Sequence, residues 1–339
     1  MGRHINIPIF IPHLGCPNQC VFCNQRTISG VKAFDISTVR DAIERNLSTK
    51  RDGDTYEIAF FGGSFTGIDR DLMIELLEIA GEYKSNGSVS AIRCSTRPDY
   101  IDEEIIGVLK KYGVDTVELG VQSASDKVLC SSKRGHTIEA TGRAARLIKD
   151  AGITLGGQMM IGLPDSTPED EILTARAIVS LGAREARIYP TLVFHDTELC
   201  SMAKDGEYSP LTLDEAVSRS SGALEIFIEN DVNLLRIGLC ESEGLKDGDS
   251  FFAGPYHPAM GELVIGEVYY QRILRQVKEA NITSGQTVDI IVSNNQASKA
   301  IGHKRINKSR LLSEHNIRVR KVLEQNIPPY TVKVIKCST

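Results

Sequence analysis

The sequence predicts an α/β protein, a partial (β/α)6 barrel followed by a small α+β domain. From residue 5 to about residue 190, short apolar runs rich in β-type residues alternate with amphipathic helical patterns. The runs are continuously apolar, which is typical of parallel strands that are covered by helices. The chain has 339 residues, of which 41% are hydrophobic. This length suits one large domain with a smaller one attached.

Six strands are predicted in the barrel: Ile5–Ile11, Tyr56–Phe61, Val89–Ser95, Thr116–Leu119, Thr154–Ile161 and Ala186–Tyr189. The intervening helices are predicted from apolar residues at helical spacing: Asp71–Tyr83, Glu103–Lys111, Ile138–Ala151 and Pro168–Leu181. Asp102 and the Ser166-Thr167 pair precede two of these helices and are suitable N-terminal caps. In such a barrel, active-site residues lie in the loops that follow the carboxyl ends of the strands.

After residue 212 the pattern is less regular, with two predicted helices, Leu213–Ile228 and Glu267–Ala280, on either side of a loop-rich stretch. The last part predicts strand, helix, helix and strand, with a short final strand: Thr287–Val292, Gln296–Ala300, Lys308–Glu314, Ile317–Leu323 and Val332–Ile335. We therefore divide the chain into a barrel (1–215), a connector (216–285) and a small basic domain (286–339).

Composition indicates a cytoplasmic protein. No apolar run approaches the roughly 20 residues that span a bilayer, so no membrane partner is expected, and the N-terminus does not resemble a signal peptide. Eight cysteines include three within eight residues, which favours metal binding over disulfides. The net charge of −5 is uneven, because Lys299–Lys336 contains ten basic and two acidic residues. A basic tail on an acidic body suggests a polyanionic partner.

The strongest motif is Cys16, Cys20 and Cys23, which follow the first strand with C-x3-C-x2-C spacing. Three thiolates from one loop can hold a [4Fe–4S] cluster and leave the fourth iron open. S-adenosylmethionine (SAM) can chelate that iron, and reduction then cleaves SAM to a 5′-deoxyadenosyl radical. The alternative is a zinc site with His13 as a further ligand. The spacing, the position after the first strand and the aromatic Phe22 favour the cluster.

Other candidate binding residues follow later strands. Gly62-Gly63-Ser64 ends the second strand, where glycines let the backbone approach a ligand closely, although the pair could equally form a turn. Gln122 and Gln158 lie near strand ends and could hydrogen-bond ribose hydroxyls. Arg134 could pair with a carboxylate in a bidentate manner. The structural alternatives are glutamines satisfied by the backbone and a surface arginine.

Together these motifs resemble the radical SAM family, and in particular the radical SAM domain of the Elongator catalytic subunit. The resemblance extends from about residue 5 to 215 and includes four further segments: Ser95–Tyr100, Glu118–Ser123, Arg134–Thr137 and Ile188–Val193. A more distant likeness is to the oxygen-independent coproporphyrinogen III dehydrogenases, which share the cysteine spacing. Nothing after Ala280 offers the glycine-rich loop of the acetyltransferase domain found in Elongator subunits, so acetyl-CoA chemistry is not expected.

The resemblance implies specific roles. The three cysteines would be the cluster ligands, Gly62 and Gly63 would contact the SAM amino group, and Arg134 would pair with the SAM carboxylate. Gln122 and Gln158 would lie near the ribose. Relatives usually have a glutamate at Ser95 and often an acidic residue at Gln158, so the ribose contacts depart from the family pattern. The family also implies an electron donor such as flavodoxin or ferredoxin.

The basic tail contains Gly302-His303-Lys304-Arg305 between its two predicted helices. Its element order resembles a KH nucleic-acid-binding domain, whose inter-helix G-x-x-G loop clamps backbone phosphates. Arg305 replaces the second glycine, so the loop is degenerate. The alternative is a solvated basic face on a small docking domain, or a dimer contact.

The leading hypothesis is a radical SAM enzyme that modifies RNA, with tRNA as the favoured substrate. One alternative is a radical SAM oxidoreductase acting on a small molecule such as a porphyrinogen. Another is a non-catalytic RNA-binding protein with a redox-sensing cluster. No catalytic residue is assigned; Tyr189, His195 and His257 could line the pocket, and for each of them a structural role is an equal alternative.

Overall fold

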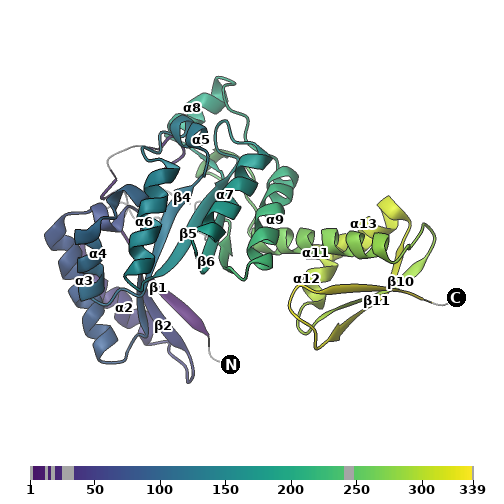
Figure 1. The fold of residues 1–339 in the computed structure, drawn as a ribbon, viewed down its shortest axis with the longest axis horizontal. Coiled ribbons are helices and arrows are strands. Elements are labelled where there is room, and N and C mark those ends of the chain that lie inside the picture. Colours follow the sequence, from purple (N-terminus) through teal and green to yellow (C-terminus); the bar gives the residue numbers. More distant parts are fainter. Residues whose placement is uncertain (1–2, 12–13, 17–19, 25–33, 240–247, 338–339) are drawn as a thin grey trace.

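The computed structural model describes residues 3–11, 14–16, 20–24, 34–239 and 248–337. Its main body is a curled sheet of parallel strands with helices packed on the outer face (Figure 1). The strands, in spatial order, are β1 (His4–Phe10), β2 (Thr55–Phe61), β3 (Ala91–Thr96), β4 (Thr116–Gln122), β5 (Thr154–Ile161), β6 (Glu185–Pro190) and β8 (Asn233–Ile237). The predicted partial barrel is therefore confirmed.

All but the first of the helices on the outer face begin at a residue whose side chain caps their free N–H groups. They are α2 (Val39–Leu47), α3 (Arg70–Ser85), α4 (Glu103–Lys111), α6 (Ile138–Asp150), α7 (Pro168–Ser180) and α9 (Leu213–Glu229). Asp102 accepts a hydrogen bond from the N–H of Ile105 at the start of α4. Thr167 and Asp170 form a reciprocal capping box at the start of α7. Both predicted helix starts are confirmed.

The two faces of the sheet differ in character because side chains alternate along each strand. On β4, Val117, Leu119 and Val121 belong to the hydrophobic core beneath the helices. Glu118, the residue between the first two, points to the inner, concave face. The same alternation on β2, β3, β5 and β6 makes the inside of the curl polar.

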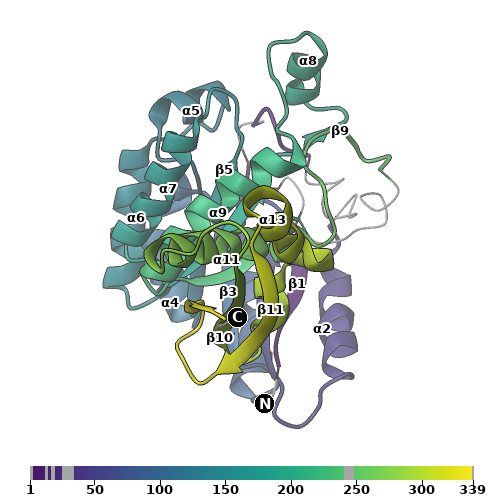
Figure 2. The ribbon, with the colours of Figure 1, turned by 90° about the vertical axis from the view of Figure 1, so that its right-hand side faces the viewer.

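A seventh strand extends the six that the sequence predicts. β8 pairs in parallel with β6 at the edge of the sheet, and of its residues only Ile237 is buried. Beyond the carboxyl end of β6, β7 (Val193–Phe194) pairs antiparallel with β9 (Phe251–Ala253). Two short helices complete this end, α5 (Asp126–Ser131) and α8 (Glu198–Lys204). Figure 2 shows β9 below α8 at the edge of the barrel.

The C-terminal domain has the predicted order of elements. β10 (Thr287–Ser293) is followed by α12 (Ala297–Ile301), α13 (Ile306–His315), β11 (Arg318–Gln325) and β12 (Val332–Lys336). Its sheet has the order β11-β10-β12, with β10 parallel to β11 and antiparallel to β12. The short 3-10 turn His303–Arg305 separates the two helices.

Helix α11 (Met260–Glu279) joins the two bodies and belongs to both (Figure 1). Its first half places Met260, Val264 and Val268 in the barrel core. Its second half places Tyr269, Tyr270, Ile273 and Val277 in the core of the C-terminal domain. The small domain therefore packs on a helix that begins well before residue 286. None of the described helices is long and apolar enough to cross a bilayer.

Candidate active site

The predicted site residues lie at one end of the sheet, where the parallel strands β1 to β5 end. The cysteine segment follows β1, the glycine pair follows β2, and Gln122 is the last residue of β4. Because the carboxyl ends of parallel strands meet at the same edge, residues from distant parts of the chain come together here.

Close backbone packing explains the glycines of this end. A Cβ on Gly63 would lie 2.3 Å from the carbonyl oxygen of Leu14, and one on Gly15 would lie 2.2 Å from that of Ser64. Gly62 has φ +110°, a conformation that L side chains rarely adopt. The glycines thus let the cysteine segment lie directly on the end of β2. Contact of Gly62 and Gly63 with the SAM amino group stays a prediction.

The three cysteines of the motif form no disulfide with any described residue. Cys20 is buried, Cys16 and Cys23 are partly buried, and the N–H of Cys23 donates to the carbonyl of Cys20 at 3.0 Å. In the described part of the chain, no three His, Cys, Asp or Glu side chains gather closely enough to hold a single metal ion. A cubane cluster binds each thiolate to a different iron, so its ligands need not converge on one point. His13, the alternative zinc ligand, lies outside the described residues.

Two buried arginines lie beside the thiols. Arg134 Nη1 is 3.6 Å from Cys20 Sγ, and its Nη2 donates to the carbonyl of Gly120 at 3.0 Å. Arg97 is among the largest fully buried side chains and forms a bidentate pair with Asp99 at 3.0 and 2.8 Å. Burial raises the pKa of the Cys16 thiol, and the positive charges of Arg134 and Arg97 oppose this rise. Both guanidinium groups therefore favour negative charge at the cysteines.

Several buried polar atoms at this end have no hydrogen-bond partner among the described residues. They include Arg97 Nη1, Arg134 Nε, Gln122 Oε1 and both ring nitrogens of His136. Burial and the neighbouring Arg134 lower the pKa of His136 to about 3, so its ring is neutral at pH 7. Buried polar groups in proteins are almost always satisfied, and a cluster of unsatisfied ones indicates a missing ligand.

A chain of hydroxyl groups connects the ends of β2 and β3. Ser64 Oγ is 2.8 Å from Thr96 Oγ1, which is 2.6 Å from Thr66 Oγ1, and Thr66 donates to the carbonyl of Tyr100. The N–H of Arg97 donates to Ser64 Oγ at 3.3 Å. Ser64 is fully buried, so its side chain positions the backbone beside Cys16, and a direct contact with a cofactor stays a prediction.

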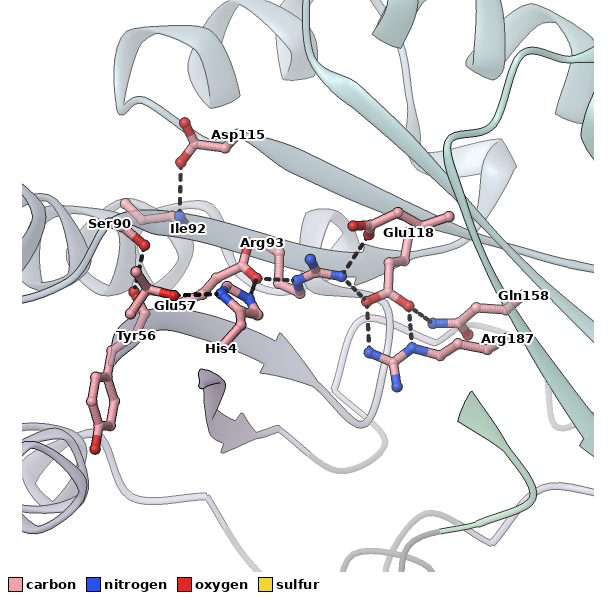
Figure 3. A network of polar contacts seen from close by, with 12 residues as sticks. His4, Tyr56, Glu57, Ser90, Ile92, Arg93, Asp115, Glu118, Gln158 and Arg187 are labelled. Atoms are coloured by element: carbon pink, nitrogen blue, oxygen red, sulfur yellow. Dashed lines mark hydrogen bonds and ion pairs between the residues drawn. The ribbon is translucent and has the colours of Figure 1, made fainter. Parts of the chain in front are cut away.

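Deeper in the concave face, buried charges are paired with one another (Figure 3). Arg93 on β3 contacts Glu57 at 2.7 Å, Glu118 at 2.8 Å and Glu185 at 3.0 Å. Arg187 on β6 donates to both oxygens of Glu118 at 2.6 and 3.0 Å. Burial would raise the pKa of Glu118, but these two arginines outweigh it and hold the pKa below its usual range.

Gln158 connects this charged network to the open end of the barrel. Its Nε2 donates to Glu118 Oε2 at 2.9 Å and to Ser95 Oγ at 3.0 Å. With both N–H bonds used, Oε1 is left to accept a hydrogen bond from a ligand. Ser95 thus accepts a hydrogen bond that orients the amide of Gln158. Both positions differ from the residues that the family resemblance leads us to expect there.

The described residues fit an anionic iron–sulfur cluster with bound SAM. The three thiols, two guanidinium groups with unused N–H bonds and a neutral histidine lie at this end of the barrel. Phe22 is partly buried beside the apolar group of Val21, Val193 and Leu199, so it anchors the cysteine segment to the β7 side of the mouth. Arg97 and His136 belong to motifs that carry the family resemblance, but the sequence alone does not show that Arg97 is buried near the thiols or that His136 is buried near Arg134.

The basic loop of the C-terminal domain depends on unusual backbone geometry. Gly302 has φ +79°, and a Cβ there would lie 2.9 Å from Ile306 and 3.0 Å from Asn307. Lys304 and Arg305 both have positive φ, at 50° and 64°. Both side chains are exposed, and neither has an ion pair among the described residues.

The loop is held against α11. Asn307 is buried and donates to the carbonyls of Gly266 at 2.7 Å and Ala300 at 3.0 Å. His303 Nδ1 is 3.2 Å from Glu262 Oε2, and its ring lies edge-on to that of His257 with centroids 5.5 Å apart. Because His257 follows β9, this contact links the basic loop to the segment that leaves the barrel mouth.

Comparison with known proteins agrees with this site. Residues 10–178 match the radical SAM superfamily, and residues 184–270 match the radical SAM C-terminal domain. Members of that superfamily use a [4Fe–4S] cluster and SAM. The structure of an archaeal Elongator protein 3 from Methanocaldococcus infernus, lacking residues 1–46, superposes with a TM-score of 0.63 at 24% identity. The match covers 83% of this chain and 64% of that one and confirms the expected fold.

Two curated relatives come from Methanocaldococcus jannaschii. A putative methylthiotransferase is 34% identical over 228 residues, which is 61% of this chain and 49% of the relative. A tRNA uridine(34) acetyltransferase is 39% identical over 139 residues, which is 40% of this chain and 26% of the relative. The chain thus spans half or less of the length of these relatives.

Proposed function

Because this chain belongs to the radical SAM superfamily and is an enzyme of that class, we propose that its substrate is RNA, and specifically a tRNA. The observation that carries this proposal is the exposed, unpaired pair of cations in the Gly302–Arg305 loop, next to the segment that leaves the barrel mouth. The name of one relative, a tRNA uridine(34) acetyltransferase, supports the same substrate class.

In the barrel, Cys16, Cys20 and Cys23 would hold the cluster, which when bound supplies the electron that cleaves SAM. Arg134 and Arg97 would neutralise the negative charge of the thiolates and of the SAM carboxylate through their unused N–H bonds. Gly62, Gly63 and Ser64 would border the SAM methionine. Gln122 and Gln158 would accept hydrogen bonds from ribose hydroxyls through their Oε1 atoms.

In the C-terminal domain, the loop would act as a KH-like phosphate clamp. The backbone of Gly302 and His303 would approach a phosphodiester, while the side chains of Lys304 and Arg305 would neutralise it. Further exposed cations of this domain have no ion pair among the described residues: Lys308, Arg318, Lys321, Lys333 and Lys336. A surface of this charge favours nucleic acid as the partner.

The first test measures 5′-deoxyadenosine released by the anaerobically reconstituted, reduced protein with and without total tRNA that lacks this enzyme's modification. Strong stimulation by tRNA is the expected result. Release that tRNA leaves unchanged would redirect the search to small molecules or proteins as substrates.

The second test replaces the loop cations. Lys304→Asn combined with Arg305→Asn removes both charges, and asparagine tolerates their positive φ. We expect the dependence of log K for single-stranded RNA on log salt concentration to weaken by about 1.4, because two phosphate contacts are lost. Arg45→Gln combined with Lys110→Gln removes the same charge from α2 and α4 of the barrel and serves as the control. Deleting residues 286–339 is unsuitable, because it would expose Tyr269 and Tyr270 on α11.

A further inference from the structure

An exposed phenylalanine lies at the mouth of the barrel. Phe252 on β9 is 44% exposed, and it is the only large aromatic residue among the exposed apolar side chains of the described chain. The Lys204 ammonium lies over its ring at 5.4 Å from the centroid. The ring of His195 meets it edge-on, with centroids 6.3 Å apart. Both neighbours are themselves exposed.

Hydrogen bonds fix this group beside the cysteine segment. Asn24, the residue after Cys23, donates through Nδ2 to the carbonyl of His195 at 3.3 Å. The N–H of Leu199, near the start of α8, donates to the carbonyl of Val21 at 2.8 Å. The elements that carry His195 and Lys204 are therefore attached to the loop that presents the cluster ligands.

The same strand leads to the basic loop. His257 lies five positions after Phe252 and contacts His303 of the Gly302–Arg305 loop. A chain of that length spans at most about 18 Å. A single ligand with flat, apolar units and a polyanionic backbone could contact Phe252 and the basic loop together.

The surroundings of Phe252 suit a nucleobase better than a protein. A docking patch for a protein needs a contiguous apolar area, whereas the neighbours of this ring are a lysine and a histidine. An exposed aromatic ring beside cations is the arrangement on which single-stranded nucleic acids stack their bases.

We propose that Phe252, with Lys204 and His195, forms a stacking platform for an unpaired nucleobase of the RNA that enters the barrel. This inference rests on the proposed RNA substrate. It adds that the part of the RNA at the barrel mouth is single-stranded. The base on the platform would be a neighbour of the modified nucleotide, and Lys204 would contribute a cation–π contact and charge toward the backbone.

The test uses the reconstituted protein with SAM and a single-stranded RNA oligonucleotide that contains 2-aminopurine. Wild type and Phe252→Tyr should quench the 2-aminopurine fluorescence, because both offer an aromatic face. Phe252→Leu keeps an apolar side chain but offers no aromatic face, so it should not quench the fluorescence. The affinity of this variant for the RNA should fall by about 5- to 150-fold. Its salt dependence should match wild type, unlike that of the Lys304→Asn/Arg305→Asn variant.

Three outcomes would overturn the platform. Equal quenching and affinity in Phe252→Leu would refute stacking while leaving the RNA substrate in place. Unchanged RNA binding with slower reduction of the cluster by reduced flavodoxin would assign Phe252 to a protein contact instead. Failure of the wild type to bind any RNA would refute both the platform and the proposed substrate class.

Discussion

The two levels of the concave face handle buried charge in opposite ways. The lower level is the network around Arg93, Glu118 and Arg187. There the charged side chains pair with one another at 2.6 to 3.0 Å. At the strand ends, Arg97, Arg134 and His136 are equally buried but leave atoms without partners. A satisfied network rigidifies a fold, and unsatisfied groups await a ligand. Burial alone therefore does not separate structural charges from functional ones, but the pairing of their atoms does.

Arg93 and Arg97 offer the sharpest test of this contrast, since both lie on or just after β3 and have 4% and 2% of their side chains exposed. Arg93→Met should lower the free energy of unfolding by about 3–5 kcal/mol, because it leaves Glu57 and Glu118 short of a cation. Arg97→Met should cost less than about 1 kcal/mol, since Asp99 is partly solvated. Urea unfolding of both variants measures the difference. Equal losses would contradict the contrast.

The reverse pattern is expected for SAM. Arg97→Met and Arg134→Met should weaken SAM binding by about 10- to 150-fold, as expected for the loss of a hydrogen bond to a charged group. Equilibrium binding to protein with verified cluster content measures this, since Arg134 also contacts Cys20. Arg143→Met, which removes a surface pair with Glu139 on α6, is the control. A loss of affinity in the control would show that the effect is not local.

His136 gives a pH signature to the open end. Its folded pKa of about 3 lies below the ordinary value of 6.5, so the unfolded chain binds a proton that the folded chain cannot. Stability should therefore fall as pH drops below about 6.5, with a contribution that approaches 1.4 kcal/mol per pH unit. His136→Gln should remove this contribution, measured as the difference between the two proteins in urea unfolding at pH 7 and pH 5. Parallel pH profiles would contradict the burial of a neutral ring.

Gln158 lies between the paired network and the open strand ends. Its substitution should have the smallest effect on stability and on SAM binding. Gln158→Leu removes one of several hydrogen bonds to Glu118 and should cost about 1 kcal/mol of stability. It also removes the free Oε1, so SAM affinity should fall by up to about tenfold. Urea unfolding and SAM binding, measured on the same preparation, would show whether the residue serves one level or both.

Local signals in the sequence sufficed for much of the fold. Strand and helix positions follow from apolar spacing, and Asp102 and Thr167 mark helix starts because capping depends on neighbouring residues only. The cysteine motif is likewise local. β8 escaped prediction because its short, half-exposed sequence is stabilised as a strand by pairing with β6.

Features that depend on distant contacts could not be predicted in the same way. Arg97 appears as a polar residue after a strand, and only packing reveals that its side chain is buried near the thiols. The close approach of Leu14 to Gly63 is likewise a contact between distant residues, and contact of Gly62 and Gly63 with SAM stays a prediction. The positive φ of Lys304 and Arg305 is unusual for these residue types and has no signal in the sequence.

Helix α11 has a consequence for how the molecule folds and comes apart. Val268 belongs to the barrel core and Tyr269 to the core of the small domain, so no flexible linker separates the two. A continuous helix transmits the loss of one core to the other, and heating should therefore unfold both in a single cooperative transition. For the same reason a protease should cleave within α11 only after both cores have opened.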